Sequence, residues 1–208
     1  MSEPHKKTIT VAITGASGSL FAAELLRLLA ADPRVAHIDL VVSDAALRVL
    51  AEELSLSGRN GLAEKFVPGL PENTHKIQQH PDENIGANIA SGSYPSNAMI
   101  ILPCSMGTLA GIAHGLASSL IQRAADVALK ERRPLILCVR ETPFNLIHLR
   151  NMTLAAEAGA TIYPIMPTLY NHPQTTTDMA RQFVHRVLAH IGMPQPGTYH
   201  WTGESPDR

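Results

Sequence analysis

Residues 8–31, TITVAITGASGSLFAAELLRLLAA, join a strand pattern, a small-residue turn and a helix pattern. The first seven residues are apolar or β-branched, which favours a buried strand. The segment GASGS follows and supplies residues that allow a tight turn. Leucines at helical spacing then predict an amphipathic helix. A strand, a turn and a helix in this order are typical of the first unit of a parallel α/β sheet.

The same alternation continues along the chain. Strand patterns cover residues 37–43, 98–103, 134–139 and 160–164, and helix patterns cover 44–54, 107–119, the following segment up to 133, 145–159 and 175–191. We predict Asp44 as the N-cap of the second helix, and loops over residues 55–93, which are rich in Gly, Asn, Pro and His. The pattern predicts one α/β domain over residues 1–208, an open doubly wound, mostly parallel sheet of the Rossmann or flavodoxin type with helices on both faces. From about residue 192, three prolines predict an extended tail.

The composition is that of a globular domain without a nucleic-acid footprint. Of the 208 residues, 45% are apolar and 17% are charged, and the formal net charge is −1. Cys104 and Cys138, the two cysteines, lie in separate apolar runs without the spacing of a zinc site, so we expect buried thiols and no metal. No apolar run reaches the roughly 18 residues of a membrane span. We therefore expect no membrane contact and a cytoplasmic location.

Hydroxyl and glycine residues follow three of the predicted strands. In an open doubly wound sheet, ligands bind beyond the carboxyl ends of the strands. Gly15, Ala16 and Ser17 follow the first strand, Ser43 follows the second, and residues 105–108 (SMGT) follow the strand at 98–103. Taken singly, turn or N-cap chemistry explains the glycine turn as well as a ligand site does, and it explains Ser43 and residues 105–108 better. Together they offer N–H and hydroxyl donors for a phosphate, and one mononucleotide can span all three ends.

The strand in PLILCVRETP, residues 134–143, ends in Arg140 and Glu141. One interpretation is a solvated ion pair, worth about 0–1 kcal/mol. In a partly closed crevice, the arginine would instead bind a phosphate and the glutamate would titrate with a raised pKa. Arg123 and Lys130 lie seven residues apart upstream, and both fit a solvated helix face equally well.

Three strings, in this order, resemble the UbiX-type flavin prenyltransferases: GASGS at residues 15–19, PCSMGTLAGIAHGLASSLIQRAADVALKERRPLILCVRETPFNLIHLRNM at 103–152, and PTLYNHPQT at 167–175. The resemblance runs from about Thr8 to Trp201 and is weakest over residues 58–84. It implies an enzyme that transfers a dimethylallyl group from dimethylallyl phosphate or diphosphate to N5 and C6 of reduced FMN. No metal takes part. The product, prenylated FMN, would serve a UbiD-type decarboxylase, as in ubiquinone biosynthesis or aromatic-acid breakdown.

The resemblance also implies roles for particular residues. The FMN would be held by Gly15, Ala16, Ser17, Ser43, Ser105, Met106, Gly107, Thr108 and Arg140, with Ser17 near the reacting edge of the ring. Tyr170 and Arg186 would bind the prenyl phosphate, helped by Arg123 and Lys130. Glu141 would protonate the departing phosphate, and the faces of Tyr170 and Trp201 would stabilise an allylic cation. Ordinary packing or a solvated surface explains each of these residues singly.

Members of this family form homo-oligomers, typically dodecamers, with the site at subunit contacts, and the small-residue helix at 107–119 would allow a close subunit approach. Two other functions fit the same fold. One is an FMN-dependent oxidative decarboxylase acting on cysteine-containing peptides, a group that does not usually carry the KERRPLILCVRETP block of residues 130–143. The other is a non-catalytic flavin carrier, which would bind FMN without needing Glu141 or Arg186.

Overall fold

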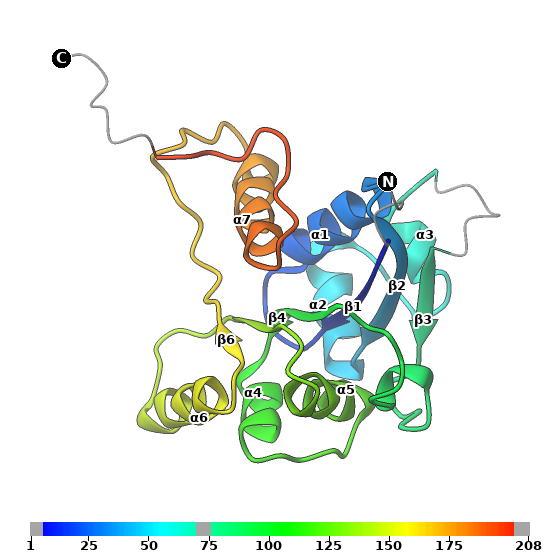
Figure 1. Cartoon of the computed structure of the whole chain (residues 1–208). Coiled ribbons are helices and arrows are strands. Elements are labelled where there is room, and N and C mark those ends of the chain that lie inside the picture. Colours follow the sequence, from blue (N-terminus) through cyan, green and yellow to red (C-terminus); the bar gives the residue numbers. More distant parts are fainter. Residues whose placement is uncertain (1–5, 70–75, 202–208) are drawn as a thin grey trace, which may run out of the picture.

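A six-stranded, all-parallel sheet forms the centre of the computed structural model, which describes residues 6–69 and 76–201 (Figure 1). The strand order is β3-β2-β1-β4-β5-β6. The strands are β1 (Lys7–Ile13), β2 (Val35–Val42), β3 (Ile77–His80), β4 (Ala98–Cys104), β5 (Leu135–Val139) and β6 (Thr161–Ile162). This order is that of the Rossmann-type doubly wound sheet, in which the direction of winding reverses between β1 and β4. The predicted fold class is confirmed.

Helices cover both faces of this sheet. One face carries α1 (Ser19–Ala31), α2 (Asp44–Leu54), α3 (Leu62–Phe66) and α7 (Thr176–His190). The other carries the 3₁₀ turn η1 (Asn88–Ala90), α4 (Met106–Ala113), α5 (Leu120–Lys130) and α6 (Leu146–Glu157). Alternate strand residues belong to the two cores: in β1, Val11 packs toward α1, and Ala12 packs toward α5. The strands therefore read as continuous apolar runs.

Hydroxyl and amide side chains fix where most helices begin. Ser43 caps α2 by accepting a hydrogen bond from the N–H of Ala46 at 3.2 Å, and Ser105 caps α4 in the same way. The prediction of Asp44 as the cap of α2 is therefore wrong. Asp44 is the first residue inside the helix, where its negative charge still suits the positive end of the helix dipole.

Two predicted boundaries also differ from the structure. Residues 55–93 were expected to be loops, but they contain α3, β3 and η1. The strand β3 reads IQQH because it lies at the edge of the sheet, where β2 is its one partner among the described strands, so it needs few apolar residues. The helix predicted at 107–119 ends at Ala113, and Gly115, with φ +66°, allows the chain to turn before α5.

The tail folds back along α7 instead of extending away, so the prediction is wrong for residues 192–201. Gly192 has φ +73°, and the N–H groups of Gly192 and Met193 donate to Ala189 O at 3.0 Å and Leu188 O at 2.9 Å. This pair of bonds is a Schellman motif, which reverses the chain at a helix end. Met193 is then fully buried. The rest of the predicted tail, residues 202–208, lies outside the described residues.

Cys104 and Cys138 are both fully buried free thiols, as expected. Burial raises the pKa of the Cys104 thiol to about 12 and raises that of Cys138 well above its ordinary value. Neither is a reactive nucleophile, since reactivity requires the thiolate. Among the helices in the described part of the chain, none combines the length and the apolar character needed to cross a membrane.

Candidate functional site

Four neighbouring strands, β2, β1, β4 and β5, end at one edge of the sheet. The register places Ile13 beside Val42 and Cys104 beside Val139, so the segments that follow these strands start side by side. The candidate residues predicted at strand ends therefore lie along one edge. They are Gly15, Ala16, Ser17, Ser43, Ser105, Met106, Gly107, Thr108 and Arg140.

Thr14 joins the two central turns. Its buried hydroxyl accepts a hydrogen bond from the N–H of Ser105 at 2.7 Å and donates one to Pro103 O at 2.9 Å. The N–H of Thr14 also donates to Pro103 O, at 3.1 Å. The turn after β1 is thus fixed against the turn after β4. Thr14 is not among the predicted site residues, although a hydroxyl at the end of an apolar strand is a signal for such a role.

The N-terminus of α4 is open to a ligand. Ser105 acts as the N-cap, its hydroxyl accepting from the N–H of Thr108 at 3.3 Å. The N–H groups of Met106 and Gly107 have no acceptor among the described residues. A Cβ built at Gly107 would meet nothing within 4 Å. Free N–H groups at the positive end of a helix suit a phosphate, so this donor set fits that part of a mononucleotide.

The N-terminus of α1 is filled by the side chain of Glu53. The Glu53 carboxylate accepts hydrogen bonds from the N–H of Gly18 at 3.0 Å and of Ser19 at 2.7 Å. Burial acts to raise the pKa of Glu53, but hydrogen bonds from the Ser17 hydroxyl and from these N–H groups outweigh it, and the pKa is lowered. The expectation that the GASGS turn binds a phosphate disagrees with this arrangement, since two anions would repel each other. The turn better suits an uncharged part of the ligand.

At two positions of this turn, the surrounding structure requires glycine. A Cβ at Gly15 would lie 2.5 Å from the Cβ of Ala45, so only glycine lets the turn pack on α2. Gly18 has φ +128° and lies against Ile165, whose Cδ1 would be 3.1 Å from an added Cβ. The contact with Ile165 brings the segment after β6 beside the turn after β1.

Arg140 and Glu141 are both exposed and line a cavity of about 290 Å³ at the end of β5. In the part of the chain that the structure describes, no ion pair joins them, and Glu141 instead accepts a hydrogen bond from the N–H of Thr142 at 3.0 Å. The interpretation as a mutual salt bridge is therefore wrong. The other lining residues are Val139, Thr142, Phe144, Pro164, Ile165 and Met166.

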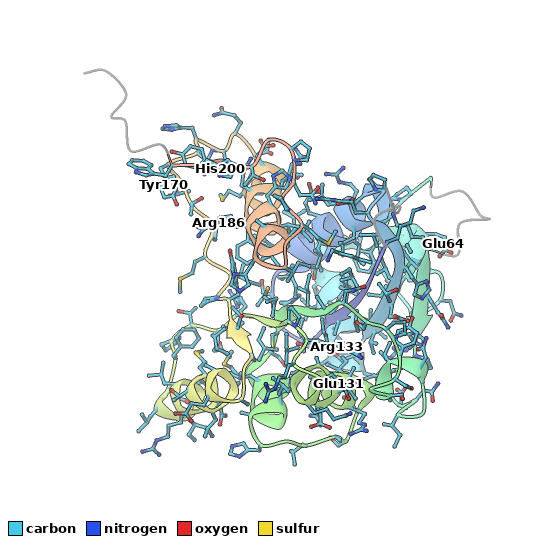
Figure 2. The ribbon with its side chains drawn as sticks, in the orientation of Figure 1. Glu64, Glu131, Arg133, Tyr170, Arg186 and His200 are labelled. Carbon is cyan, nitrogen blue, oxygen red and sulfur yellow. The ribbon has the colours of Figure 1, made fainter. Side chains whose placement is uncertain are left out.

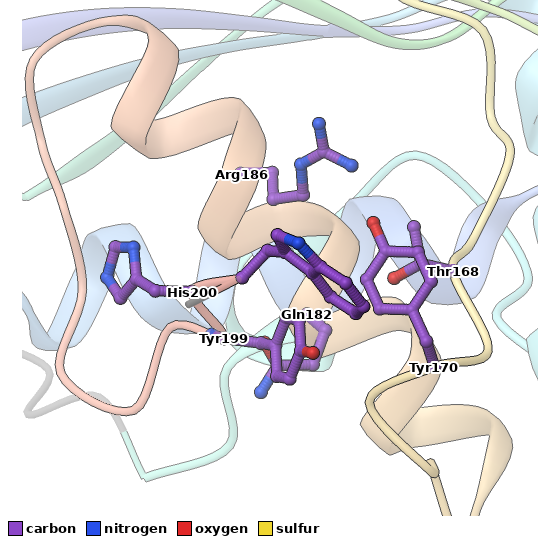
Figure 3. Close-up of a pocket in the computed structure, with 7 residues that line it drawn as sticks. Thr168, Tyr170, Gln182, Arg186, Tyr199 and His200 are labelled. Atoms are coloured by element: carbon purple, nitrogen blue, oxygen red, sulfur yellow. The ribbon is translucent and has the colours of Figure 1, made fainter. Parts of the chain in front are cut away.

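A second cavity, of about 230 Å³, lies between α7, the segment after β6 and the tail (Figure 3). It brings together Tyr170, Arg186 and Trp201, which the sequence analysis assigned to one ligand. The rings of Tyr170 and Trp201 meet edge to face with centroids 6.0 Å apart. Ligand pockets commonly measure about 300–1,000 Å³, so this cavity suits a small molecule. The remaining lining residues are Thr168, Gln182, Tyr199 and His200.

Arg123 and Lys130 do not reach this cavity within one chain. Both lie on α5, which covers the opposite face of the sheet from α7. Arg123 forms an ion pair with Asp126 at 2.7 Å, and Lys130 forms one with Glu131. Figure 2 shows Glu131, the neighbour of Lys130 in sequence, far from Arg186. Within one chain, these cations therefore lie across the sheet from Arg186, and their action on the same prenyl phosphate stays a prediction.

The sheet order, the open helix N-terminus and the small-residue turns define a mononucleotide-binding α/β protein. Comparison with known proteins narrows this class. A family model described as Flavoprotein matches residues 1–191. Flavin prenyltransferase UbiX of Salmonella typhimurium is 47% identical over 190 residues, which are 91% of this chain and 94% of that protein.

Two solved structures agree with this relationship. The crystal structure of AnUbiX (PadA1) in complex with FMN and dimethylallyl pyrophosphate has a TM-score of 0.85 and 34% identity, covering 97% of this chain and 100% of that one. The dodecameric FMN-dependent UbiX-like decarboxylase from Escherichia coli O157:H7 has a TM-score of 0.83 and 38% identity, covering 94% and 100%. The chain belongs to the flavoprotein family and, within it, to the UbiX flavin prenyltransferases.

Proposed function

We propose that this protein transfers a dimethylallyl group from dimethylallyl phosphate or diphosphate to N5 and C6 of reduced FMN. The observation that carries the proposal is the cavity in which Arg186, Tyr170 and Trp201 meet. The complex of AnUbiX with FMN and dimethylallyl pyrophosphate supports it, because that relative binds both reactants.

The strand-end residues would hold the FMN. The open N-terminus of α4, with Ser105, Met106, Gly107 and Thr108, would bind the phosphate through its N–H and hydroxyl donors. The turn formed by Gly15, Ala16 and Ser17 would face the ring, with Ser43 and Arg140 on the flanking strand ends. Bound there, reduced FMN supplies the nucleophilic nitrogen and carbon that accept the prenyl group.

The second cavity would hold the prenyl phosphate. When the bond between carbon and oxygen breaks, the departing phosphate gains negative charge, so it needs cationic groups beside it and a proton for its oxygen. The Arg186 guanidinium can bind two phosphate oxygens at once, and the Tyr170 hydroxyl can donate to a third. Glu141 would deliver the proton. The aromatic faces of Tyr170 and Trp201 would stabilise positive charge on the allyl group.

A neighbouring subunit would supply Arg123 and Lys130, because α5 of the same chain lies across the sheet. A dodecameric relative supports assembly. So does α6, which leaves Leu146, Ile147 and Leu149 exposed. We further propose that a UbiD-type decarboxylase receives the prenylated FMN.

Anaerobic incubation with reduced FMN and each donor, followed by mass spectrometry of the released flavin, tests the proposal. The expected product carries one added five-carbon unit. Unmodified flavin with both donors would reject it. An oxidative decarboxylase would instead turn over a cysteine-containing peptide without altering the flavin. A flavin carrier would be unchanged by Glu141→Gln or Arg186→Ala, whereas the transferase carrying Glu141→Gln should keep FMN and lose prenyl transfer.

A further inference from the structure

Gln182 of α7 binds the tail, residues 192–201, through both the nitrogen and the oxygen of its side-chain amide. Its Nε2 donates to Gly197 O at 3.1 Å, and its Oε1 accepts from the N–H of Tyr199 at 3.2 Å. One neutral side chain therefore bonds the tail backbone on either side of Thr198. Gln182 and Tyr199 both line the second cavity (Figure 3).

The remaining tail anchors lie further from the cavity. The Arg34 guanidinium donates to Pro194 O at 3.0 Å, and the Gln195 amide donates to the Asp32 carboxylate at 3.0 Å. These bonds fix the start of the tail against the turn between α1 and β2. Beyond Thr198, the bond to Gln182 is the one hydrogen bond found for the tail backbone within the described residues. Gln182 thus supplies the hydrogen bond that helps to hold Tyr199 and the residues after it, beside the ring contacts of Tyr199 and Trp201 with Tyr170.

Gln182 also lies one helical turn before Arg186, at a spacing of four residues, which places the two on one face of α7. In the described part of the chain, no carboxylate forms an ion pair with Arg186. A glutamate at position 182 would be well placed to pair with Arg186, because an acid four residues before a base is the favoured helical orientation. A neutral amide leaves the guanidinium free.

We propose that Gln182 is a positioning residue for the prenyl donor. It holds the tail so that Trp201 packs on Tyr170 and completes the aromatic wall opposite Arg186, and its neutrality keeps the charge of Arg186 available for the phosphate. The inference rests on the proposed function for the identity of the donor. Glutamine suits the position because the site needs one donor and one acceptor, whereas a carboxylate lacks the donor and a cation lacks the acceptor.

Two variants separate the two parts of the role. Gln182→Met keeps the size and loses both tail bonds. Gln182→Glu keeps an acceptor for Tyr199 and adds a charge beside Arg186. Gln78→Met, at an exposed position on the edge strand β3, is the matched control. Trp201 is the single tryptophan of the chain, so nanosecond fluorescence anisotropy of the ligand-free protein reports the tail directly.

For Gln182→Met we expect a larger fast component in the Trp201 anisotropy decay. The KM for dimethylallyl phosphate should rise by about tenfold, the effect of one or two lost hydrogen bonds, while the Kd for FMN stays within about twofold. For Gln182→Glu we expect a similar rise in KM with a smaller change in anisotropy. Gln78→Met should match the parent protein in all three measurements.

Unchanged Trp201 anisotropy and donor KM in Gln182→Met would overturn the inference. An equal loss of FMN and donor binding would overturn it too, because that result indicates general damage. If the parent protein forms no prenylated flavin, the proposed function fails. The anisotropy alone then decides whether Gln182 positions the tail.

Discussion

The Glu53 carboxylate accepts a hydrogen bond from the backbone N–H of Ser19 at 2.7 Å, at the first residue of α1. An internal acid therefore occupies the helix end that the glycine-rich turn would otherwise offer to a phosphate. The open N-terminus of α4 remains for that purpose. This difference between the two helix ends explains how two adjacent turns of similar composition take different roles at the carboxyl ends of the strands.

Glu53→Gln should make the folding stability less dependent on pH in the acid range. The pKa of Glu53 is lowered below its ordinary value of 4.5 by hydrogen bonds that outweigh burial. A lowered carboxyl pKa contributes stability that is complete above pH 4.5 and is lost as the pH falls toward the folded pKa. Thermal unfolding at about five pH values between roughly pH 3 and pH 7 measures this loss of stability. The control is Glu52→Gln, at the exposed neighbouring position, and an equal effect of both changes would contradict the assignment.

Thr14→Val should loosen the β4–α4 turn. Valine has no hydroxyl, so the buried Ser105 N–H loses its acceptor and Pro103 O loses one of its two donors. This loss should lower the unfolding free energy by about 1–3 kcal/mol. FMN binding should weaken as well, because Ser105 begins the open helix. Urea unfolding and FMN fluorescence titration measure the two effects. Thr14→Ser keeps the hydroxyl and should restore both, and a Thr14→Val protein with parental FMN affinity would contradict this account.

Arg186→Lys should impair donor use although it keeps the charge. An ammonium cannot bind two phosphate oxygens in the planar geometry of a guanidinium. Since hydrogen bonds to charged groups contribute about 1.5–3 kcal/mol, we expect kcat/KM for the prenyl donor to fall by about ten- to a hundredfold. Steady-state kinetics with saturating reduced FMN measure the change. Arg48→Lys, at an exposed position on α2, is the control.

His185→Leu should remove part of the pH dependence of stability. His185 is buried in α7, its Nδ1 has no hydrogen-bond partner in the described ranges, and burial followed by the nearby charge of Arg181 lowers its pKa below 6.5. A lowered histidine pKa means that the unfolded chain takes up the proton first, so stability falls as the pH drops below 6.5. The slope should be shallower in His185→Leu and unchanged in His190→Leu, at an exposed position of the same helix. An equally steep slope in both would contradict the prediction.

Mixed assemblies should recover activity if two subunits share one site. Lys130→Ala and Arg186→Ala each remove one cation, and α5 and α7 lie on opposite faces of the sheet. Co-expressed in one assembly, the two variants would form some sites with an intact Lys130 from one chain and an intact Arg186 from another. We expect partial prenyl transfer from the mixture and almost none from either variant alone. Mixing Tyr170→Phe with Arg186→Ala, which alter one cavity of one chain, should restore nothing.

The sequence predicted the central sheet well, because a buried parallel strand is an unbroken apolar run. It failed at β3, a short edge strand in which Gln78 and Gln79 carry no such signal. The candidate phosphate site at Ser105 followed from residue type and position alone. The grouping of Tyr170 with Arg186 and Trp201 came from family resemblance, since these residues lie on three separate segments and no local pattern joins them.

Other features depend on tertiary contacts. Glu52 and Glu53 are adjacent acids, and which of them faces the turn after β1 is set by the orientation of α2 on the sheet. The role of Gln182 depends on the reversal of the chain after α7. A glycine after a helix predicts that the helix ends there, but the path of the chain beyond Gly192 is determined by packing, including the burial of Met193.

The return of the tail along α7 separates the wall of the second cavity from the hydrophobic core. Tyr199 and Trp201 are exposed side chains on a segment outside the sheet and its helices. Because these two side chains lie outside both cores, we expect substitutions there to change the size of ligand that the cavity admits with little effect on folding stability.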